Sequence, residues 1–467
     1  MTDLPRNIVL LRGWRLLILL TCFFLIHTAG KSDSEAGMPQ KKPNPSYTQS
    51  SPPPKSPDPI SIFGVQIEGP IGEAQGLQQA VSGGAHWLRF DAFDWDRIEP
   101  LPTSPATYHW EAVDEASLLN AVRNGLEIIA VVKYLPGWAQ KYPGSACGPI
   151  HSEALSRFAK FLASLVHRYK NPPFNIKHWE LGNEPDAPVW PGRSPFGCWG
   201  EKDDPYFGGE YYAKMLKAAY PALKAADPKA RVLLGGLLLD NPNETANNTA
   251  RFLEGILKGG GGPFFDLISF HGYSYPYGTE GRMGNPNWPG SGTSVTEKVT
   301  FIKKILKRYG FHNKPLLNTE AALYCDSESP QCLETQSMFV PRAYAEGIAT
   351  GLQGLVYYAL VCDFRSLGLL RPDLSPRPSY RAYQTAASFL AQARYRGLPA
   401  GYPVGITAYS FVPPTGGELD LIWSDDGDSR TVSLTPGSRV YDRYGSLINP
   451  EEGTITVGSG PVYIQRP

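Results

Sequence analysis

Apolar residues follow two alternating patterns from residue 60 to about residue 395. Short runs rich in β-branched and aromatic residues predict strands, and the segments between them repeat apolar positions at helical spacing. The expected strands are Ile60–Ile67, Trp87–Phe90, Ile128–Val132, Ile176–Leu181, Val232–Leu238, Leu267–His271, Pro315–Thr319 and Gly354–Leu360. The clearest expected helices are Glu153–Tyr169, Tyr211–Ala226, Ala250–Leu257, Thr296–Tyr309, Glu334–Thr350 and Tyr380–Tyr395.

This alternation of strands with helices predicts an α/β fold with a parallel sheet, because parallel neighbours need a crossover connection. Eight such units between residues 59 and 397 suit a (β/α)8 TIM barrel with long loops. A doubly wound open sheet is the alternative. It is disfavoured because no expected strand is followed by a Gly-rich dinucleotide-binding loop.

The pattern changes after residue 397 to short alternating runs separated by turn signals such as Pro413–Gly417 and Asp425–Asp428. The expected strands are Thr407–Val412, Leu419–Trp423, Thr431–Leu434, Arg439–Tyr444, Thr454–Val457 and Val462–Gln465. Residues 398–467 are therefore predicted to form a small antiparallel, sandwich-like β domain.

The N-terminal region has the features of an export signal. Basic residues precede an apolar run from Leu16 to Ile26, and small residues follow at Thr28–Gly30. The run is shorter than the roughly 20 residues of a membrane span, so residues 1–30 predict a signal peptide, with an uncleaved N-terminal membrane tether as the alternative. Residues 31–58 form a Pro- and Ser-rich linker. In either case the protein is expected to be secreted or otherwise extracytoplasmic.

Export permits disulfide bonds. Five cysteines follow the leader: Cys147, Cys198, Cys325, Cys332 and Cys362. Cys325 and Cys332 flank a short polar loop, and Cys147 and Cys198 both lie in loops assigned to one face of the barrel. We expect these two pairs, with Cys362 as a buried thiol. The spacings match no zinc pattern, and no metal or cofactor is predicted.

The charge balance argues against a nucleic-acid partner. The formal net charge is +0 and the pI is about 7.1. A nucleic-acid partner normally requires a basic surface, so none is expected here.

Two glutamates stand at the ends of expected strands. Glu184 follows the fourth strand, directly after Asn183, and Glu320 follows the seventh. The two positions are 136 apart (320 minus 184), but the ends of strands 4 and 7 face each other across a closed barrel. Catalytic residues of such barrels lie at these carboxyl ends. Two carboxylates flanking one bond are what glycoside hydrolysis requires.

Several segments also match a known group. The matching segments are Arg89–Asp91, Trp179–Pro185, His271–Tyr273, Leu317–Glu320 and the closing residues Leu367–Leu370 with Pro378–Tyr380. Across nearly the whole exported part, the chain resembles the retaining glycoside hydrolases of clan A, the 4/7 superfamily of TIM barrels. It leans toward family 39 or family 5-like enzymes.

The resemblance implies roles for these residues. Glu184 is the expected general acid/base and Glu320 the expected nucleophile, while Asn183 is expected to bind the sugar 2-hydroxyl. Physical chemistry agrees, because an ionised Glu320 nearby raises the pKa of Glu184. After glycosylation that charge disappears, and Glu184 can then lose its proton and activate water.

The resemblance further implies that Tyr273 donates a hydrogen bond to the nucleophile and that His271 and Arg89 shape its surroundings. Arg89 and Tyr273 are expected to keep Glu320 charged. Alternative interpretations are an Arg89 that neutralises Asp91 and a His271 that is only a packed core residue. Glu180, inside the fourth strand, is the main rival acid and is expected in the barrel interior or in a buried ion pair.

Sugar-binding sites need flat apolar surfaces on which CH faces of sugars stack. Aromatic residues are frequent in the loops at the expected catalytic face. Those expected to contact a sugar are Trp138, Trp190, Tyr275 and Tyr358.

Together these features predict a retaining glycosidase acting by double displacement on a plant or microbial oligo- or polysaccharide, without a cofactor. The rivals are a transglycosylase, a non-catalytic polysaccharide-binding barrel and a metal-dependent hydrolase. Pure binding does not need both glutamates and Asn183. Metal dependence is disfavoured because the histidines show no HxH or HExxH spacing.

Overall fold

A computed structural model describes residues 61–245, 248–290 and 292–467. The expected export signal and linker, residues 1–58, lie outside the described residues. Among the helices in the described ranges, none is both long enough and apolar enough to cross a membrane.

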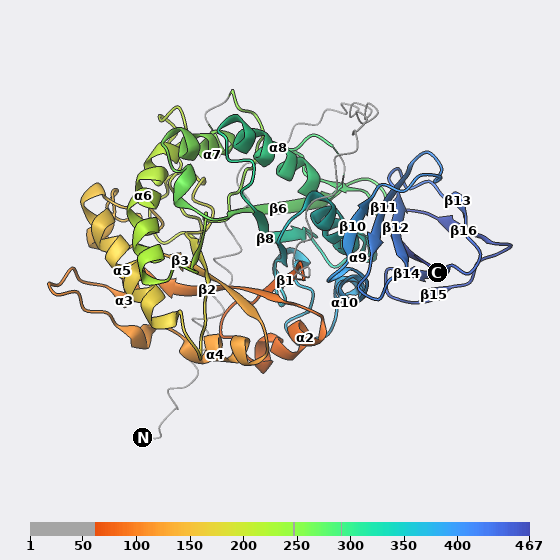
Figure 1. Cartoon of the computed structure of the whole chain (residues 1–467), viewed down its shortest axis with the longest axis horizontal. Coiled ribbons are helices and arrows are strands. Elements are labelled where there is room, and N and C mark those ends of the chain that lie inside the picture. The colour runs from red at the N-terminus through yellow and green to blue at the C-terminus, as the bar shows by residue number, and fades with distance from the viewer. Residues whose placement is uncertain (1–60, 246–247, 291) are drawn as a thin grey trace, which may run out of the picture. The chain divides into compact units, whose positions relative to one another are not determined.

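The described chain contains a closed parallel barrel (Figure 1). Its strands are β1 (Phe63–Gln66), β2 (Trp87–Asp94), β3 (Glu127–Lys133), β4 (His178–Leu181), β5 (Arg231–Leu233), β6 (Ile268–Pro276), β8 (Leu316–Leu323) and β9 (Gly354–Tyr357). Hydrogen bonding follows the order β5-β4-β3-β2-β1-β9-β8-β6, with parallel neighbours. The ring closes through a parallel bridge between Leu233 of β5 and Leu267, directly before β6. Beyond β5, Leu237 N donates to Ser269 O at 3.0 Å and His271 N donates to Leu237 O at 2.9 Å. The predicted (β/α)8 barrel is therefore confirmed.

A two-residue strand, β7 (Met283–Gly284), pairs antiparallel with β6. The seventh and eighth barrel strands therefore have the labels β8 and β9. The β5 strand is shorter than the predicted Val232–Leu238, because the chain leaves the ladder at Gly235 and Gly236, and Gly236 has a φ of 63°.

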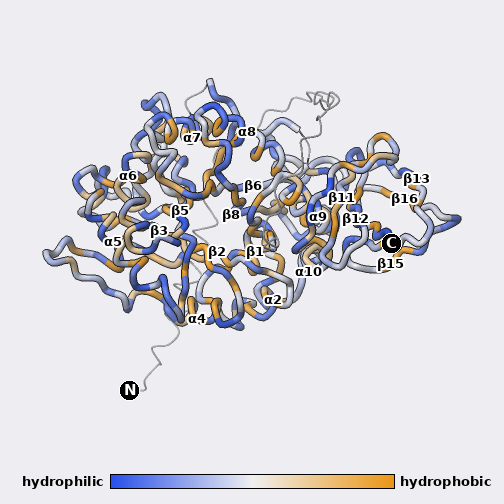
Figure 2. Tube along the Cα trace, viewed as in Figure 1, coloured by the Kyte–Doolittle hydropathy of each residue, from blue (hydrophilic) through white to orange (hydrophobic). Residues whose placement is uncertain are grey.

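Helices surround the barrel. They are α2 (Leu77–Ser82), α3 (Trp95–Ile98), α4 (Glu115–Arg123), α5 (Leu155–Tyr169), α6 (Gly209–Ala226), α7 (Thr249–Lys258), α8 (Val295–Arg308), α9 (Pro330–Thr350) and α10 (Pro378–Leu390). Short 3-10 turns are η1 (Glu73–Gln75), η2 (Trp110–Ala112), η3 (Gly137–Ala139), η4 (Ser152–Ala154), η5 (Gly262–Phe264) and η6 (Phe364–Ser366). Hydrophobic and hydrophilic residues alternate along the outer helices (Figure 2). In α5, for example, Phe158, Phe161, Leu162 and Leu165 are buried at helical spacing.

An apolar cluster fills part of the barrel. Its members come from or directly precede different strands: Trp87, Ile129, Leu233, Leu267, Leu317 and Val356. A fully buried side chain of this kind contributes roughly 1.5–3 kcal/mol. Such packing holds the strands rigidly, so the residues at their carboxyl ends have fixed positions.

The C-terminal residues form the predicted antiparallel domain. Its strands are β10 (Arg394–Gly397), β11 (Ile406–Val412), β12 (Glu418–Ser424), β13 (Arg430–Ser433), β14 (Arg439–Asp442), β15 (Leu447–Ile448), β16 (Thr454–Val457) and β17 (Val462–Arg466). One sheet has the order β10-β11-β12-β17-β14-β15, and β13 pairs with β16. Residues of both sheets share one core cluster, including Ile422, Val432, Ile455 and Ile464, which fits a small sandwich.

The predicted helix Tyr380–Tyr395 is too long at its C-terminal end. Helix α10 ends at Leu390, and Arg394–Gly397 pairs with β11 as strand β10. The reason is a change of period, because exposed and half-buried residues alternate along β10. The antiparallel sheet thus begins before residue 398.

Side chains of α9 and α10 attach this domain to the barrel. Phe389 stacks on Tyr463 with ring centroids 4.6 Å apart. Arg443 Nε donates to Ser337 Oγ at 2.8 Å, and Tyr444 Oη donates to Glu334 at 2.7 Å.

Both predicted disulfides are present. Cys147–Cys198 joins the loop after β3 to the loop after β4, and Cys325–Cys332 joins the end of β8 to α9. Cys362 is buried, as predicted, and lies outside both bonds.

Candidate active site

Glu184 lies three residues beyond β4 in an unusual backbone conformation. Its φ is 52°, in the left-handed region, and the preceding Gly182 has a φ of 94°. Neighbouring loops hold the turn, because Glu184 N donates to Gly235 O at 2.5 Å and Gly197 N donates to Glu184 O at 3.2 Å. A non-glycine residue held in this region is destabilising and is frequent at functional sites.

Glu320 lies inside β8 and not at its end, since the strand continues to Leu323. The parallel pairing of β6 with β8 sets His271 opposite Glu320, with a register shift between Phe270 and His271. This register brings the two side chains to the same end of the barrel.

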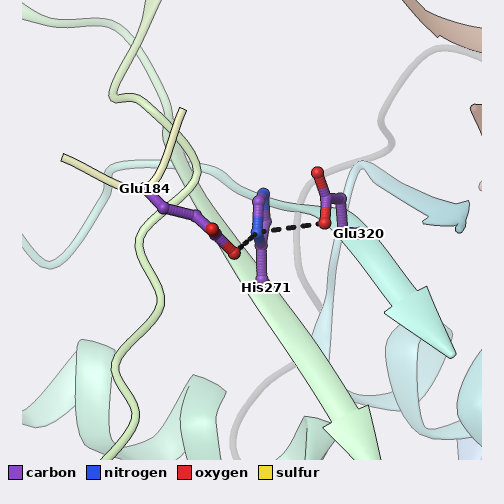
Figure 3. Close-up of side chains that lie close together, drawn as sticks. All are labelled: Glu184, His271 and Glu320. Atoms are coloured by element: carbon purple, nitrogen blue, oxygen red, sulfur yellow. Dashed lines mark hydrogen bonds and ion pairs between the residues drawn. The ribbon is translucent and has the colours of Figure 1, made fainter. Parts of the chain in front are cut away.

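His271 lies between the two glutamates (Figure 3). Its Nδ1 is 2.7 Å from Glu184 Oε1 and 3.4 Å from Glu320 Oε2. One carboxylate oxygen of each glutamate and one His271 nitrogen all lie within 4.8 Å of one another, and all three residues are buried.

The trio Glu184, His271 and Glu320 also defines a possible metal-binding group among the described residues. However, Arg89 and Tyr273 already donate to the two oxygens of Glu320. A cation at this position would have to compete with both donors and lie close to the Arg89 charge.

Arg89 connects the polar groups under the site. Its Nε donates to Glu180 Oε2 at 2.6 Å, its Nη2 to Asn183 Oδ1 at 2.6 Å, and its Nη1 both to Gln66 Oε1 at 2.7 Å and to Glu320 Oε1. The structure thus places Arg89 against Glu320.

The other interpretation, in which Arg89 neutralises Asp91, finds less support, because the Asp91 carboxylate is paired with Lys133. Glu180 is fully buried and also accepts from Thr319 Oγ1 at 2.9 Å. It lies in the expected buried ion pair.

Tyr273 and Asn183 complete the contacts around the glutamates. Tyr273 Oη donates to Glu320 Oε2. Asn183 accepts from Arg89 and donates from Nδ2 to Pro195 O at 3.1 Å, so its amide orientation is fixed.

The two glutamates differ in their electrostatic surroundings. Burial raises the pKa of Glu320 to about 7, although Arg89 and the Tyr273 hydroxyl lower it. Burial, followed by the negative charge of Glu320, raises the pKa of Glu184 well above its ordinary value. The charge of Glu320 therefore raises the pKa of Glu184, as expected. Arg89 and Tyr273 favour the Glu320 anion, as expected, but burial outweighs them in the net shift of its pKa.

The surroundings of His271 favour the neutral imidazole. Burial lowers its pKa well below the ordinary value, and Arg89 and Lys298 lower it further. A neutral imidazole beside Glu184 exchanges a hydrogen bond with that carboxyl group without adding a charge to the site.

Two of the four expected sugar-contacting aromatics lie beside Tyr273. The rings of Tyr273 and Tyr275 both stack on the Tyr324 ring, and each centroid lies 4.9 Å from that of Tyr324. Tyr358 lies edge-on to Tyr273, with the two ring centroids 6.1 Å apart. Sequence reasoning missed Tyr324. The available signal was its position directly after β8, four residues beyond Glu320 and so on the same face of an extended chain.

The other two expected aromatics lie elsewhere. The Trp138 ring packs edge-on against Trp95 at 5.2 Å, with the Arg157 guanidinium 5.2 Å from its centroid. Trp190 is 50% exposed on the loop after β4, where its carbonyl accepts from Ser145 Oγ at 2.8 Å.

Sequence reasoning also missed Lys298. This buried lysine of α8 donates from Nζ to His271 O at 2.8 Å and to Leu238 O at 2.7 Å. Burial lowers its pKa to about 8. The signal was a charge on the apolar face of a helix, between the buried Val295 and Val299.

No protein-family model matches this chain, and no curated protein matches it in sequence. Solved structures do resemble it. One is a family 39 glycoside hydrolase from the gut symbiont Bacteroides cellulosilyticus WH2, with 20% identity, a TM-score of 0.67, and coverage of 88% of this chain and 81% of that chain.

In two further comparisons, the match covers nearly the whole solved chain. A GH30 endoxylanase from Clostridium papyrosolvens C71 has 14% identity and a TM-score of 0.55 over 88% of this chain and 98% of that one. A GH51 α-L-arabinofuranosidase from Thermotoga petrophila RKU-1 has 13% identity and a TM-score of 0.53 over 88% and 97%. The fold is therefore the one shared by these clan A glycoside hydrolases, as the sequence resemblance implied.

Proposed function

We propose that this protein is an exported retaining glycosidase that cleaves O-glycosidic bonds of an oligo- or polysaccharide. Glu184 acts as the acid/base and Glu320 as the nucleophile. The observation behind this proposal is the approach of two buried carboxylates to within 4.8 Å, each with different partners. Retaining enzymes place these groups about 5–5.5 Å apart and inverting enzymes about 6.5–9.5 Å, so the approach favours retention.

In the first step Glu320 must be ionised and Glu184 protonated. Arg89 and the Tyr273 hydroxyl lower the pKa of Glu320, whereas the charge of Glu320 raises the pKa of Glu184, and both effects favour this assignment. Glu320 attacks the anomeric carbon while Glu184 gives its proton to the leaving oxygen, which breaks the glycosidic bond. A hydrogen bond from the sugar 2-hydroxyl to Asn183 strengthens in this transition state.

In the second step the charge of Glu320 is consumed by the ester bond to the sugar. Since that charge raises the pKa of Glu184, its loss lets Glu184 hold a negative charge and take a proton from water. The resulting hydroxide attacks the anomeric carbon and releases Glu320. Double inversion gives a product with the anomeric configuration of the substrate.

Export is part of the same proposal. Two disulfides in the described chain support an oxidising compartment. Fractionation of cells that produce the full chain, with mass spectrometry of the mature N-terminus, tests it. Recovery of an unprocessed chain with reduced cysteines in the cytoplasm contradicts export.

The decisive experiment for the chemistry uses a panel of aryl glycosides. The first product anomer, followed by NMR, is expected to retain the substrate configuration. A 2-fluoro glycoside that matches the best substrate is expected to label Glu320, as identified by peptide mass spectrometry. Inversion, or a label on Glu180, contradicts the assignment. Transfer to added alcohols without release of free sugar identifies a transglycosylase instead.

A further inference from the structure

The barrel closes through few backbone contacts, and it does so between two residues of the site. Strand β5 has only three residues, and residues 235–239 beyond it run beside β6 without forming a regular ladder. We call residues 235–239 the closure segment. Glu184 N donates to Gly235 O at 2.5 Å, and His271 N donates to Leu237 O at 2.9 Å. The closure segment therefore joins the backbone of the proposed acid/base to the backbone of its histidine partner.

The closure segment also lies against the His271 ring. Gly236 has a φ of 63°, and a Cβ atom at this position would lie 2.3 Å from His271 Nε2. The Nδ1 atom of the same ring is 2.7 Å from Glu184 Oε1. The imidazole thus lies between the closure segment and the Glu184 carboxyl group, so the position of the segment sets the position of the ring against Glu184.

Two buried charged residues bind the backbone of the closure segment. Lys298, on α8, donates from Nζ to Leu238 O at 2.7 Å and to His271 O at 2.8 Å. Asp186 accepts from Leu238 N at 2.8 Å and from Leu239 N at 2.9 Å. Lys298 and Asp186 are 2% and 0% exposed. Leu238 is therefore held through both its N–H and its carbonyl oxygen.

A packing role alone does not explain the lysine. A buried ammonium group is costly unless it is hydrogen-bonded, and the neighbouring buried positions of α8, Val295 and Val299, are apolar. Both hydrogen bonds of Lys298 go to backbone carbonyl oxygens on the two sides of the closure, and one of them belongs to His271. A charged donor makes a stronger hydrogen bond than a neutral one, so Lys298 fixes the closure segment against β6.

The nucleophile is held by other contacts. Glu320 lies in β8, which pairs with β6 on one side and with β9 on the other. Arg89 also reaches Glu320 from β2. Loss of the Lys298 contacts should therefore displace His271 and Glu184 more than Glu320.

We infer that Lys298 is a positioning residue for the acid/base and that Asp186 assists it by binding the closure segment. Lys298 acts through the His271 backbone and the closure segment, which together set the contact between His271 and Glu184. This inference rests on the proposed function, in which Glu184 protonates the leaving oxygen.

The test uses aryl glycosides of the best sugar with leaving groups of different acidity. The kcat/KM value reports the first step, in which a poor leaving group needs the proton of Glu184 and a very acidic one does not. Lys298→Met is expected to lower kcat/KM roughly 10- to 100-fold for a phenyl glycoside, because a misplacement of about 1 Å costs roughly 100-fold. For a dinitrophenyl glycoside the loss is expected to stay below about 3-fold.

Lys224→Met is the matched control. Lys224, on α6, donates from Nζ to Ala230 O at 2.6 Å, directly before β5. It makes the same type of contact between a helix lysine and a backbone carbonyl, but at the amino end of the strand. Its kcat/KM is expected to stay within about 2-fold of the wild type for both leaving groups.

Asp186→Asn tests the other contact with a side chain of the same size. One of the two acceptors of the closure segment becomes an amide nitrogen, which cannot accept a hydrogen bond. The same dependence on the leaving group is expected at a smaller size, roughly 3- to 10-fold for the phenyl glycoside. Melting curves show which variants are folded, and Asp186→Asn decides the question if Lys298→Met is not.

The outcomes separate this inference from the proposed function. If the wild type hydrolyses no aryl glycoside, or if Glu184→Ala loses activity equally for every leaving group, the proposed function fails. If Glu184→Ala shows the dependence on the leaving group and the folded Lys298 and Asp186 variants do not, the inference alone is overturned. An equal loss for both leaving groups in these variants assigns Lys298 a purely structural role and overturns the inference as well.

Discussion

Glutamate and histidine lie close together at both ends of the barrel. The glutamate pKa is lowered at one end and raised at the other. At the amino ends of the strands, Glu127 lies 3.3 Å from His86 Nε2 and 3.0 Å from His178 Nδ1, and its side chain is 36% exposed. At the carboxyl ends, Glu184, His271 and Glu320 form a buried trio. Both clusters contain histidine and glutamate on neighbouring strands.

The difference lies in how the charges are compensated. Burial opposes ionisation of Glu127, but its contacts with His178 and His86 outweigh it and lower the pKa to about 2. In the buried trio, burial dominates and raises the pKa of both glutamates. A compensated ion pair is typical of a structural cluster, whereas buried acids with raised pKa values are frequent at functional sites.

The largest expected effect is on kcat, and it distinguishes a substitution at the carboxyl ends of the strands from one at the amino ends. Glu320→Ala is expected to lower kcat roughly 10,000-fold or more, because no other group can form the glycosyl ester. Glu127→Ala is expected to leave kcat within about 2-fold. Steady-state kinetics on the best aryl glycoside, with melting curves for both variants, checks this. Near-normal turnover by folded Glu320→Ala protein would remove the nucleophile assignment.

The next effect distinguishes the two glutamates within the trio. Glu184→Ala is expected to lower turnover of substrates with poor leaving groups roughly 100- to 10,000-fold, since protonation of the leaving oxygen is lost. Aryl glycosides with very acidic leaving groups are expected to keep a near-normal first step, which a pre-steady-state burst measures. Equal losses on both substrate types contradict the acid/base role.

A smaller effect concerns the pH dependence. The reaction requires ionised Glu320, so kcat/KM should rise with pH through the Glu320 pKa of about 7. It should fall at higher pH as Glu184 loses its proton. Tyr273→Phe removes a hydrogen bond that lowers the Glu320 pKa, so the acid limb is expected to move up by roughly one pH unit.

Tyr275→Phe is the matched control for this shift. Tyr275 stacks on the same Tyr324 ring as Tyr273 but has no hydrogen bond to Glu320 among the described contacts. The acid limb of the kcat/KM profile of Tyr275→Phe should stay at the wild-type pH. If the acid limb of Tyr273→Phe also stays at the wild-type pH, the Tyr273 hydroxyl does not affect the pKa of Glu320.

The smallest effect lies at the amino end and appears only in stability. The Glu127 pKa falls from 4.5 to about 2 on folding, so its stabilising contribution is present above pH 4.5 and is lost as the pH falls toward 2. Glu127→Gln is expected to lower the free energy of unfolding by roughly 1 kcal/mol just above pH 4.5, given the partial exposure, because the ion pair exists only while its histidine partners carry a proton. Denaturant titrations at several pH values measure the difference, which should vanish near pH 2. A constant difference contradicts the ion-pair explanation.

Much of the architecture followed from local patterns. The eight barrel strands, the C-terminal sheet and the Cys325–Cys332 bond were predicted because period, turn residues and close cysteines act over short distances. The Cys147–Cys198 bond was predicted only because the barrel assignment set both loops on one face. The Asn183–Glu184 pair was recognisable because a polar pair at a strand end is exposed to the site in this fold. Errors came where the period changed, as at Arg394–Gly397.

The contacts of the site were harder to predict. Arg89 joins residues up to 231 positions away, and the sequence did not show that it bonds Glu180, Gln66 and Asn183 together. Lys133 and Lys298 read locally as ordinary charges on a strand and a helix, yet one pairs with Asp91 and the other supports the His271 backbone.

By itself, the sequence determined which residues form strands and which polar groups stand near the strand ends. Only the tertiary structure decided that His271 lies between Glu184 and Glu320, and that burial raises both of their pKa values. The physical reason is that barrel closure and the β6–β8 register set distances between remote strands. Desolvation depends on all the atoms packed around a group, which no local pattern specifies.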